Sequence, residues 1–473
     1  MGNGQSSPLQ TCLDAVCGDR SDCVAYKGDP FYQLSWVKPF NLDVPVTPVA
    51  VIRPDNAKDV AEAVKCAAAS DVKVQAKSGG HSYANYGLGG DDGALMVDLV
   101  NLKDFSMDED TWYASVGAGH RLGEMDKKMH AAGKRAMAHG TCPSVGIGGH
   151  ATIGGLGPMS RMWGSALDHV IEVEVVTADG EIQRASQEEN SDLFFALRGA
   201  GASFGIITEF VVKTHPEPGS VVEYTFNFSF GRQKDMADVY RQWQTLTGDP
   251  DMDKRFSSLF IAMPLGAVVT GTFYGTEEEF EKTGIPDKLP SGGKLEANVT
   301  DWLGSLAHEA ETAALALGDL PSSFYSKSLA FREEDLLDDD SIDALFDYMD
   351  DEKVGTLLWF IIWDSTGGVI NEIKPDSSAY PHRDKVFMYQ SYAVGIPTLS
   401  DTTKNFLEGV HEHIQKGAPN AASTYAGYVD PAYERDEAQK LYWGDRLPEL
   451  QKIKKKWDAS NVFQNPQSVT PAK

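Results

Sequence analysis

The sequence lacks the uninterrupted apolar run of about 20 residues that a membrane-spanning helix needs. Its first six residues also lack the apolar core of a secretory signal. Basic residues are scarce, because 42 Lys and Arg stand against 69 Asp and Glu and leave a net charge of −27. A chain this acidic is repelled by phosphate backbones and anionic lipid. We therefore expect neither nucleic acid nor a membrane as a partner.

Cysteine is also sparse, with five residues and no Cys-x-x-Cys pair. That absence excludes zinc-knuckle and thioredoxin-type sites, and we expect no metal. Internal repeats and low-complexity tracts are missing too. The 42% hydrophobic and 23% charged content is ordinary for a globular protein. At 473 residues the chain has room for two domains.

Glycine is plentiful, and two loops concentrate it. Residues 77–83 read Lys-Ser-Gly-Gly-His-Ser-Tyr, and residues 139–150 read His-Gly-Thr-Cys-Pro-Ser-Val-Gly-Ile-Gly-Gly-His. Without a Cβ, such loops let backbone N–H groups converge on an anion. The first loop presents His81 and the second, about 60 residues later, presents Cys142. The two loops together predict an anion-binding site.

This pair of loops resembles the flavin-binding domain of the vanillyl-alcohol oxidase superfamily. Within it the chain is similar to the berberine-bridge-enzyme branch, and most similar to fungal gluco-, chito- and xylo-oligosaccharide oxidases. The resemblance implies FAD bonded covalently through its 8α-methyl to His81 and through C6 to Cys142. It implies further flavin contacts from Ser78, Gly79, Gly80, Ser82, Thr141, Val145, Gly146, Gly149, His150 and Ile207.

Two of these residues have more specific implied roles. His150 would stand near flavin N1 as a positive or hydrogen-bond-donating group that stabilises the reduced flavin; a structural core histidine is the alternative. Val145 lies three residues after Cys142, where a small side chain in this branch is associated with oxygen access. Valine there favours an oxidase.

The segment Thr424–Asp430 resembles the family's Tyr-x-x-Tyr-x-Asp segment, and the resemblance makes Tyr428 the catalytic base. A tyrosine with a pKa of about 10 needs help at neutral pH. A nearby carboxylate by itself raises that pKa, because like charges repel. We therefore expect a relay in which Asp364 receives the phenol proton. The alternative is a tyrosine–aspartate hydrogen bond that serves packing alone.

Strand alternation places Phe360, Ile362 and Asp364 on one face, and Met388, Gln390 and Tyr392 on one face of another strand. The resemblance gives sugar contacts to Gln390 and Tyr83. We expect Phe360, Ile362 and Tyr392 to line the same substrate groove, although aromatics at this period are also ordinary sheet core. Glucose-chain oxidases carry polar groups where this chain has Ile362 and, by a looser alignment, Ile261. The exact sugar therefore stays open.

The resemblance implies oxidation of the anomeric C1 hydroxyl of a reducing-end oligosaccharide to the lactone, with O2 reduced to H2O2. Three alternatives remain. The first is an oxidase of an aromatic alcohol or alkaloid, and the second is a dehydrogenase that passes electrons to an acceptor other than oxygen. The third is a flavin-bearing binding protein without activity. We expect a monomer.

The pattern of elements predicts an α+β fold of the two-domain, PCMH-type FAD oxidase architecture. Residues 1–217 form the flavin domain and 218–420 a substrate domain with an antiparallel sheet covered by helices. Residues 421–473 return to the flavin domain. Expected strands are 49–52, 72–76, 95–99, 170–177, 181–185, 204–213, 221–230, 257–262, 268–274, 356–364 and 386–394. Expected helices are 56–70, 122–132, one opening at 191, 233–247, 300–317, 401–416 and 434–457, after an irregular arm at 1–45.

Two further patterns bear on cofactor and compartment. Residues 199–205 look like a dinucleotide fingerprint, but the third glycine comes one position late and the segment follows a helix, so we expect no nicotinamide site.

The resemblance implies a Cys12–Cys66 disulfide, whereas Cys17 and Cys23 either bridge or stay reduced. Disulfides and the sequons at Asn227 and Asn298 favour an extracellular protein; the missing signal points the other way.

Overall fold

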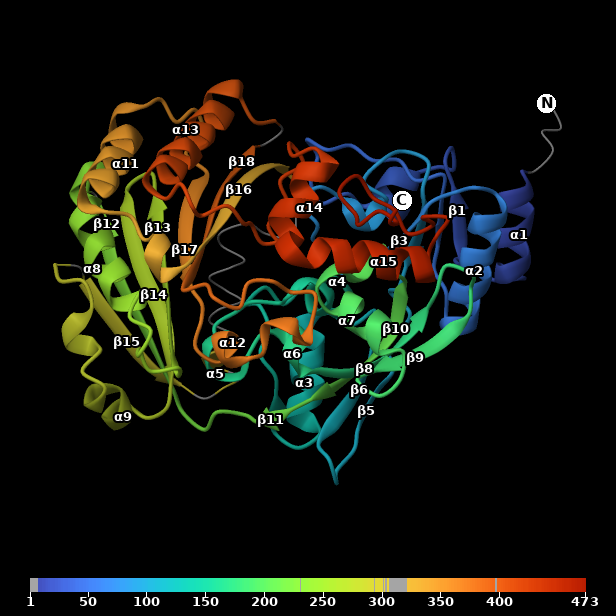
Figure 1. Ribbon diagram of the computed structural model, residues 1–473, viewed down its shortest axis with the longest axis horizontal. Coiled ribbons are helices and arrows are strands. Elements are labelled where there is room, and N and C mark those ends of the chain that lie inside the picture. The colour runs from blue at the N-terminus through green and yellow to red at the C-terminus, as the bar shows by residue number, and fades with distance from the viewer. Residues whose placement is uncertain are drawn as a thin grey trace.

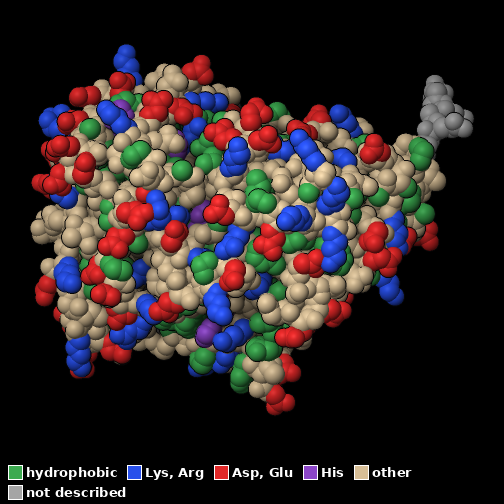
Figure 2. Space-filling model, viewed as in Figure 1, with side chains coloured by type: hydrophobic (Ala, Val, Ile, Leu, Met, Phe, Trp, Pro, Cys, Tyr) green, Lys and Arg blue, Asp and Glu red, His purple; other side chains and the backbone are tan. Residues whose placement is uncertain are grey.

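The computed structural model describes residues 7–229, 231–292, 294–300, 302, 304–305, 321–395 and 398–473. Helices and antiparallel sheets combine in an α+β fold, which confirms the predicted fold class. One end of the molecule holds a large sheet with helices on its outer side, and the other holds two smaller sheets with the N-terminal helices (Figure 1). Lys and Arg are interspersed with Asp and Glu over the visible face (Figure 2). Within the described ranges, no helix has the length and apolarity to cross a membrane.

The first small sheet has the order β1-β2-β4-β3. Its strands β2 (Ala50–Ile52), β4 (Leu95–Asp98) and β3 (Val74–Lys77) are parallel, and β1 (Val24–Tyr26) joins β2 in antiparallel fashion. Helix α2 (Ala57–Ala69) connects β2 to β3. It begins at Asn56, whose side chain accepts hydrogen bonds from two backbone N–H groups of the first turn. Strand β3 therefore delivers the chain directly into the loop that carries His81.

The second small sheet has the order β5-β6-β10-β8-β9 and is antiparallel throughout. The predicted hairpin is β8 (Val170–Val176) and β9 (Ile182–Ser186), and the predicted return strand is β10 (Ile206–Lys213). Strands β5 (Phe105–Met107) and β6 (Tyr113–Gly117) were not predicted. Helices α3 (Leu122–Ala131) and α7 (Ser191–Ala200) match the predicted ones. The remaining elements here are α4 (Ile147–Ile153), α5 (Ser160–Trp163), α6 (Ala166–His169), β7 (Arg135–Ala136) and β11 (His215–Pro216).

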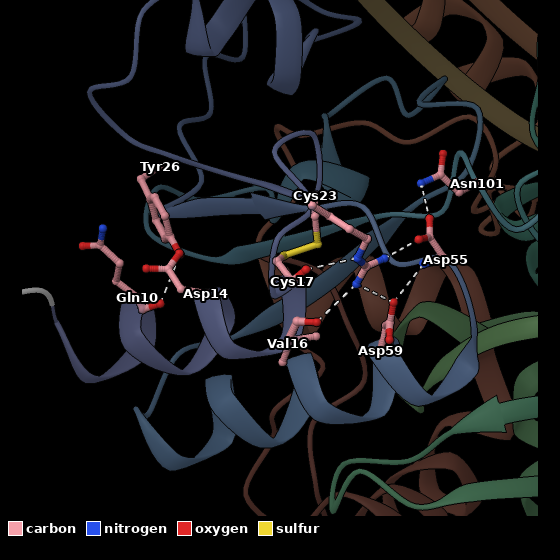
Figure 3. The surroundings of a disulfide bond; sticks show 10 residues. Gln10, Asp14, Val16, Cys17, Cys23, Tyr26, Asp55, Asp59 and Asn101 are labelled. Carbon is pink, nitrogen blue, oxygen red and sulfur yellow. Dashed lines mark hydrogen bonds and ion pairs between the residues drawn. A yellow bond between two sulfur atoms is a disulfide. The ribbon is translucent and has the colours of Figure 1, made fainter.

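The prediction of an irregular arm at 1–45 was wrong, because residues Pro8–Cys17 form helix α1. Ser7 caps it, Pro8 occupies its first turn, and Leu9, Leu13 and Cys17 bury one side at helical spacing. The Cys12–Cys66 disulfide ties α1 to α2, as the resemblance implied, and Cys17 bridges to Cys23. Figure 3 shows the second bridge beside Asp55 and Asp59, which both bind the Arg20 guanidinium.

The large sheet is antiparallel and has the order β15-β12-β14-β13-β17-β18-β16. One face is buried under helices α8 (Ala237–Thr247), α11 (Asp339–Asp351) and α13 (Asp401–Gly417), on the outer side in Figure 1. The predicted helix at 300–317 lies largely outside the described residues, and β15, β16 and α11 were not predicted. The strands are β12 (Val221–Ser229), β13 (Phe256–Met263), β14 (Gly266–Tyr274), β15 (Lys294–Thr300), β16 (Ser323–Phe331), β17 (Trp359–Ser365) and β18 (Phe387–Gly395), with short helices α9 (Glu277–Lys282) and α12 (Val369–Glu372).

The C-terminal segment returns to the first sheets. Its buried residues, among them Trp443, Leu450 and Phe463, belong to the same hydrophobic cluster as α2, β4 and β10. The single helix predicted at 434–457 is two helices, α14 (Arg435–Trp443) and α15 (Leu447–Trp457). Gly444 ends α14 with a positive φ of 47°, and Pro448 lies in the first turn of α15. The domain boundaries at 217 and 420 stay predictions.

Candidate active site

The two glycine loops lie backbone to backbone. A Cβ added at Gly79 would lie 2.2 Å from the nitrogen of Gly146, and one added at Gly146 would lie 2.1 Å from the nitrogen of Gly79. Only glycine at both positions permits this approach. The Ser78 hydroxyl locks the contact, because it donates to the Ala118 carbonyl at 2.6 Å and accepts from the Gly148 N–H at 3.3 Å. The loops thus form one preassembled cradle.

The cradle opens into a cavity of about 1040 Å³ between the small sheets and the uncovered face of the large sheet. A volume at the upper end of ordinary ligand sites suits a large cofactor together with a substrate. All residues predicted for flavin binding, catalysis and substrate contact line this cavity. They are Ser78, Gly79, Gly80, His81, Ser82, Tyr83, Thr141, Cys142, Val145, Gly146, Gly149, His150, Ile207, Phe360, Ile362, Asp364, Gln390, Tyr392 and Tyr428.

His81 and Cys142 both belong to this lining. Cys142 is the cysteine outside the two disulfides. Its thiol acts electrostatically on the Tyr83 and Tyr392 phenols, and His81 acts on the His150 imidazole. A Cβ placed on Gly149 would meet nothing within 4 Å, so the cradle leaves space in front of its glycines. The nucleophilic side chains, the glycine cradle and the open space fit an FAD bound in this cavity.

His150 is a neutral histidine. Its Nε2 accepts a hydrogen bond of 2.8 Å from the Gly140 N–H, so the ring proton is on Nδ1. Burial, followed by the nearby His139 and His81 rings, lowers the pKa of His150 to about 3. Of the two forms expected from the sequence, the structure favours the hydrogen-bond donor over the positive charge.

A buried pair that the sequence analysis did not assign holds the Cys142 turn. His139 lies between Asp126 of α3, 2.7 Å from its Nε2, and the Gly140 carbonyl, 2.8 Å from its Nδ1. Both side chains are less than a tenth exposed. The pair connects helix α3 to the residues just before Cys142. No sequence signal distinguishes it, because Asp126 and His139 meet only after folding.

The proposed base lies among aromatic rings. The Tyr428 ring stacks on Tyr83 with centroids 6.3 Å apart and meets Tyr425 edge-on at 5.1 Å. Burial, and then the charge of Asp364, raises the pKa of the Tyr428 phenol well above its usual value. Burial also raises the pKa of the Asp364 carboxyl to about 7. In the described part of the chain no direct hydrogen bond joins the two side chains, so their coupling is electrostatic.

The pKa of Asp364 gives a pH prediction. Only the ionised carboxylate can accept a proton in the relay, and ionisation is completed as the pH rises through about 7. We expect the rate of anaerobic flavin reduction to increase with pH around a midpoint near 7. The variant Asp364→Asn should be slow and should lose this midpoint. Stopped-flow absorbance from pH 5 to 9 checks it, and an unchanged midpoint in the variant would contradict the relay.

The far wall of the cavity is the uncovered face of the large sheet. The Tyr83 hydroxyl reaches Gln390 Oε1 at 3.4 Å, and the Phe360 and Tyr392 rings lie 5.3 Å apart. Met388 lies on the same face of β18 as Gln390, as predicted, but it does not line the cavity. It is buried against Tyr380 and Tyr425, which cover this end of the face together with Tyr428.

Two further sequence predictions concern residues of this wall. Asn227 lines the cavity, so a glycan on this sequon would occupy the groove. The Asn298 side chain lies outside the described part of the chain.

Ile261 and Ile362 are opposite each other on β13 and β17, and both face the cavity. The looser alignment thus placed Ile261 on the same wall as Ile362.

A buried lysine anchors the segment that carries Tyr428. Lys327 Nζ on β16 lies 2.9 Å from both Glu408 of α13 and Asp430, two residues after Tyr428. The Lys327 and Asp430 side chains are 7% and 2% exposed. Burial alone would lower the pKa of Lys327, but the two carboxylates outweigh it and the net direction is upward. The ion pair fixes the base segment to the substrate sheet.

We expect Lys327→Met to lower the free energy of unfolding by about 3–5 kcal/mol, because Asp430 keeps a buried charge without its partner. The matched control is Lys456→Met. That lysine pairs with Asp192 at 2.6 Å, but their side chains are 61% and 35% exposed, and such surface pairs contribute about 0–1 kcal/mol. Denaturant unfolding of both variants measures the difference. Equal losses would show that the buried pair is not an anchor.

Similarity to known proteins supports the same site. Residues 48–186 match the FAD binding domain family, and residues 424–470 match the berberine and berberine-like family. Within the described residues, no cluster of His, Cys, Asp and Glu has the arrangement of a metal site. The matched ranges contain both glycine loops and the Tyr428 segment.

The chain is 39% identical over 470 residues to the FAD-linked oxidoreductase sorD of Penicillium rubens, covering 98% of this chain and 99% of that protein. It is 34% identical over 451 residues to the xylooligosaccharide oxidase of Thermothelomyces thermophilus, covering 92% and 89%. The structure of a chitooligosaccharide oxidase superimposes with a TM-score of 0.89 at 30% identity, covering 99% of this chain and 100% of that chain. The glucooligosaccharide oxidase of Acremonium strictum gives 0.89 at 31%, covering 99% of both chains. The chain therefore belongs to the berberine-bridge-enzyme-like family of FAD-linked oxidases.

Proposed function

We propose that the protein oxidises the anomeric C1 hydroxyl of a saccharide to the lactone, with FAD attached through His81 and Cys142. The observation that carries the proposal is a single cavity lined by both of these residues, by the Tyr428–Asp364 pair and by Gln390. Relatives named xylooligosaccharide, glucooligosaccharide and chitooligosaccharide oxidase support the substrate class. The structure of the glucooligosaccharide oxidase of Acremonium strictum is described as containing a 6-S-cysteinyl, 8α-N1-histidyl FAD, and this supports the double attachment.

Bound FAD supplies the acceptor for the hydride that leaves C1. Tyr428 takes the proton of the C1 hydroxyl, and the phenol proton moves toward Asp364. Gln390 and the Tyr83 hydroxyl, already 3.4 Å apart, orient the hydroxyl groups beside C1. The rings of Tyr83 and Tyr428 limit water access to the reacting carbon. Holding the C–H and the base in one geometry is the main contribution of the protein to the rate.

The electron acceptor is the second part of the proposal. We infer that O2 takes two electrons and two protons and leaves as H2O2, because the half-buried Val145 leaves room beside the cradle. A dehydrogenase that uses a quinone is the competing candidate. Peroxide yield per sugar oxidised distinguishes the two. A yield near one supports the oxidase, and a yield near zero supports the dehydrogenase.

A second substrate class is favoured by one observation. The apolar Ile261, Ile362 and Phe360 on the substrate wall suit an aromatic alcohol. Anaerobic bleaching of the flavin by cellobiose, xylobiose, chitobiose and a benzylic alcohol separates the two classes. Bleaching by a sugar supports the first proposal, and bleaching by the aromatic alcohol alone would replace it.

A further inference from the structure

The strand register aligns an apolar row across the substrate wall. Ile362 on β17 lies opposite Gln390 on one side and Ile261 on the other, and Ile261 lies opposite Val268 on β14. Val268 in turn lies opposite Asn227 on β12. All five side chains line the cavity. We call Ile362, Ile261 and Val268 the apolar row; it begins beside Gln390 and ends at Asn227.

The neighbouring row of the same face is mostly polar. Asp364 lies opposite Leu259, which lies opposite Thr270, which lies opposite Thr225. Thr225 and Thr270 share a hydrogen bond of 2.9 Å between their hydroxyls. The apolar character of the wall is therefore confined to one row, which runs from Gln390 to Asn227 beside a row with polar groups at Asp364, Thr270 and Thr225. A sugar lying along the apolar row would find no hydrogen-bonding side chain of that row between Gln390 and Asn227.

The apolar row faces the cavity, not the core. Ile261 and Ile362 are half-buried, whereas their chain neighbours Phe260 and Ile361 are fully buried under the helices. A sugar hydroxyl lying on the row would lose its hydrogen bonds to water without gaining a partner. An apolar group placed there would instead cover the exposed side chains and release water.

We propose that the natural saccharide carries an apolar acyl or alkyl substituent, which lies along the apolar row while its C1 hydroxyl meets Tyr428. Adjacent strands are about 4.8 Å apart, so the row from Ile362 to Val268 spans about 10 Å. The substituent is thus a medium-length chain that ends near Thr225 and Asn227. This inference rests on the proposed anomeric oxidation and names the class of sugar that the same site accepts.

The first test compares sugars that differ only in the chain. Glucose, 6-O-butanoylglucose, 6-O-octanoylglucose and cellobiose are used to reduce the holoenzyme anaerobically. We expect kcat/KM to rise by at least about 10-fold from glucose to the octanoyl ester, since even one methylene in a well-fitting apolar pocket is worth that order. Cellobiose equal to or better than the octanoyl ester would overturn the inference and leave anomeric oxidation standing.

The second test measures binding without turnover. Calorimetry compares 1,5-anhydroglucitol, which has no C1 hydroxyl, with its 6-O-octanoyl ester. Tighter binding of the ester by 10-fold or more is expected, and equal binding would overturn the inference. If no saccharide bleaches the flavin, the proposed function fails, yet this binding result still decides whether the row holds an apolar chain.

Two variants test whether the octanoyl chain lies on the apolar row. Ile261→Gln and Ile362→Gln should each lower the selectivity for 6-O-octanoylglucose over cellobiose, measured as the ratio of their kcat/KM values, by about 10-fold. The control is Leu265→Gln, in the β13–β14 turn, where the side chain is 62% exposed and outside the cavity lining. A loss of octanoyl selectivity in the control, or its retention in both isoleucine variants, would show that the chain lies elsewhere.

Discussion

Replacing Tyr428 by phenylalanine should slow anaerobic flavin reduction by substrate about 10²–10⁴-fold, the range that a positioned general base contributes. The phenylalanine ring preserves the stacking on Tyr83 at 6.3 Å and the edge contact with Tyr425, so the fold and the flavin should persist. Only the proton acceptor is removed. Stopped-flow bleaching of the bound flavin measures the rate, and a spectrum of the resting protein confirms that the flavin is present.

The matched control is Tyr433→Phe on the same segment. Its ring lies over Lys327 at 5.7 Å and outside the cavity lining, so it should change the rate by less than a factor of about three. A Tyr428→Phe variant that bleaches as fast as the wild type would exclude Tyr428 as the base. It would also favour the alternative of a flavin-bearing binding protein, which predicts that Tyr428 has no effect on the bleaching of the flavin by substrate.

Removing both His81 and Cys142 should abolish covalent attachment of the flavin. We expect the acid-precipitated wild-type protein to stay yellow, because two bonds survive loss of the fold. His81→Ala and Cys142→Ala should each keep one bond and the colour, with a changed absorption maximum that reports which carbon remains attached. The double variant should precipitate colourless and leave its FAD in the supernatant.

The double variant also has an internal control. Its glycine cradle is intact, because the contact between Gly79 and Gly146 involves neither side chain. It should therefore bind FAD reversibly before precipitation, which fluorescence titration measures. Yellow precipitate from the double variant would show that another residue attaches the flavin, and colourless wild-type precipitate would show that none does.

Local patterns predicted much of the fold. The helix that begins at Asn56 and the hairpin at 170–186 carry their own caps, turns and alternation. Strand β16 was missed because Lys327, Ser326 and Ser328 make it look polar. All three side chains are buried in the folded protein, where Lys327 pairs with Glu408 of α13 and with Asp430, and the Ser328 hydroxyl bonds to Thr424. Helix α1 was missed although Ser7, Pro8 and the Leu9–Leu13 spacing are present, so that error was avoidable.

Some residues of the site were predicted from the sequence, and others were found only in the structure. The motifs identified His81, Cys142, Tyr428 and Gln390, and every residue they indicated lines one cavity. The pairs Asp126–His139 and Lys327–Asp430 had no signal, because the two partners of each pair come from different segments that meet only in the folded chain. Met388 lies on the same face as Gln390, as alternation predicted, but Tyr380 and Tyr425 cover it, because alternation gives the face of a strand and not what packs on it.

The sequence by itself determined which chemistry the chain carries, since glycine, histidine, cysteine and tyrosine at fixed spacings are properties of short segments. Tertiary structure decided what that chemistry can reach. The register of β17, β13 and β14, set in part by pairing between strands far apart in the chain, placed Ile362, Ile261 and Val268 in one row that begins beside Gln390. Burial in the assembled cavity raised the pKa of Asp364 to about 7 and lowered that of His150 to about 3. Both effects depend on neighbours that no segment contains, because solvent exclusion and strand pairing exist only in the folded chain.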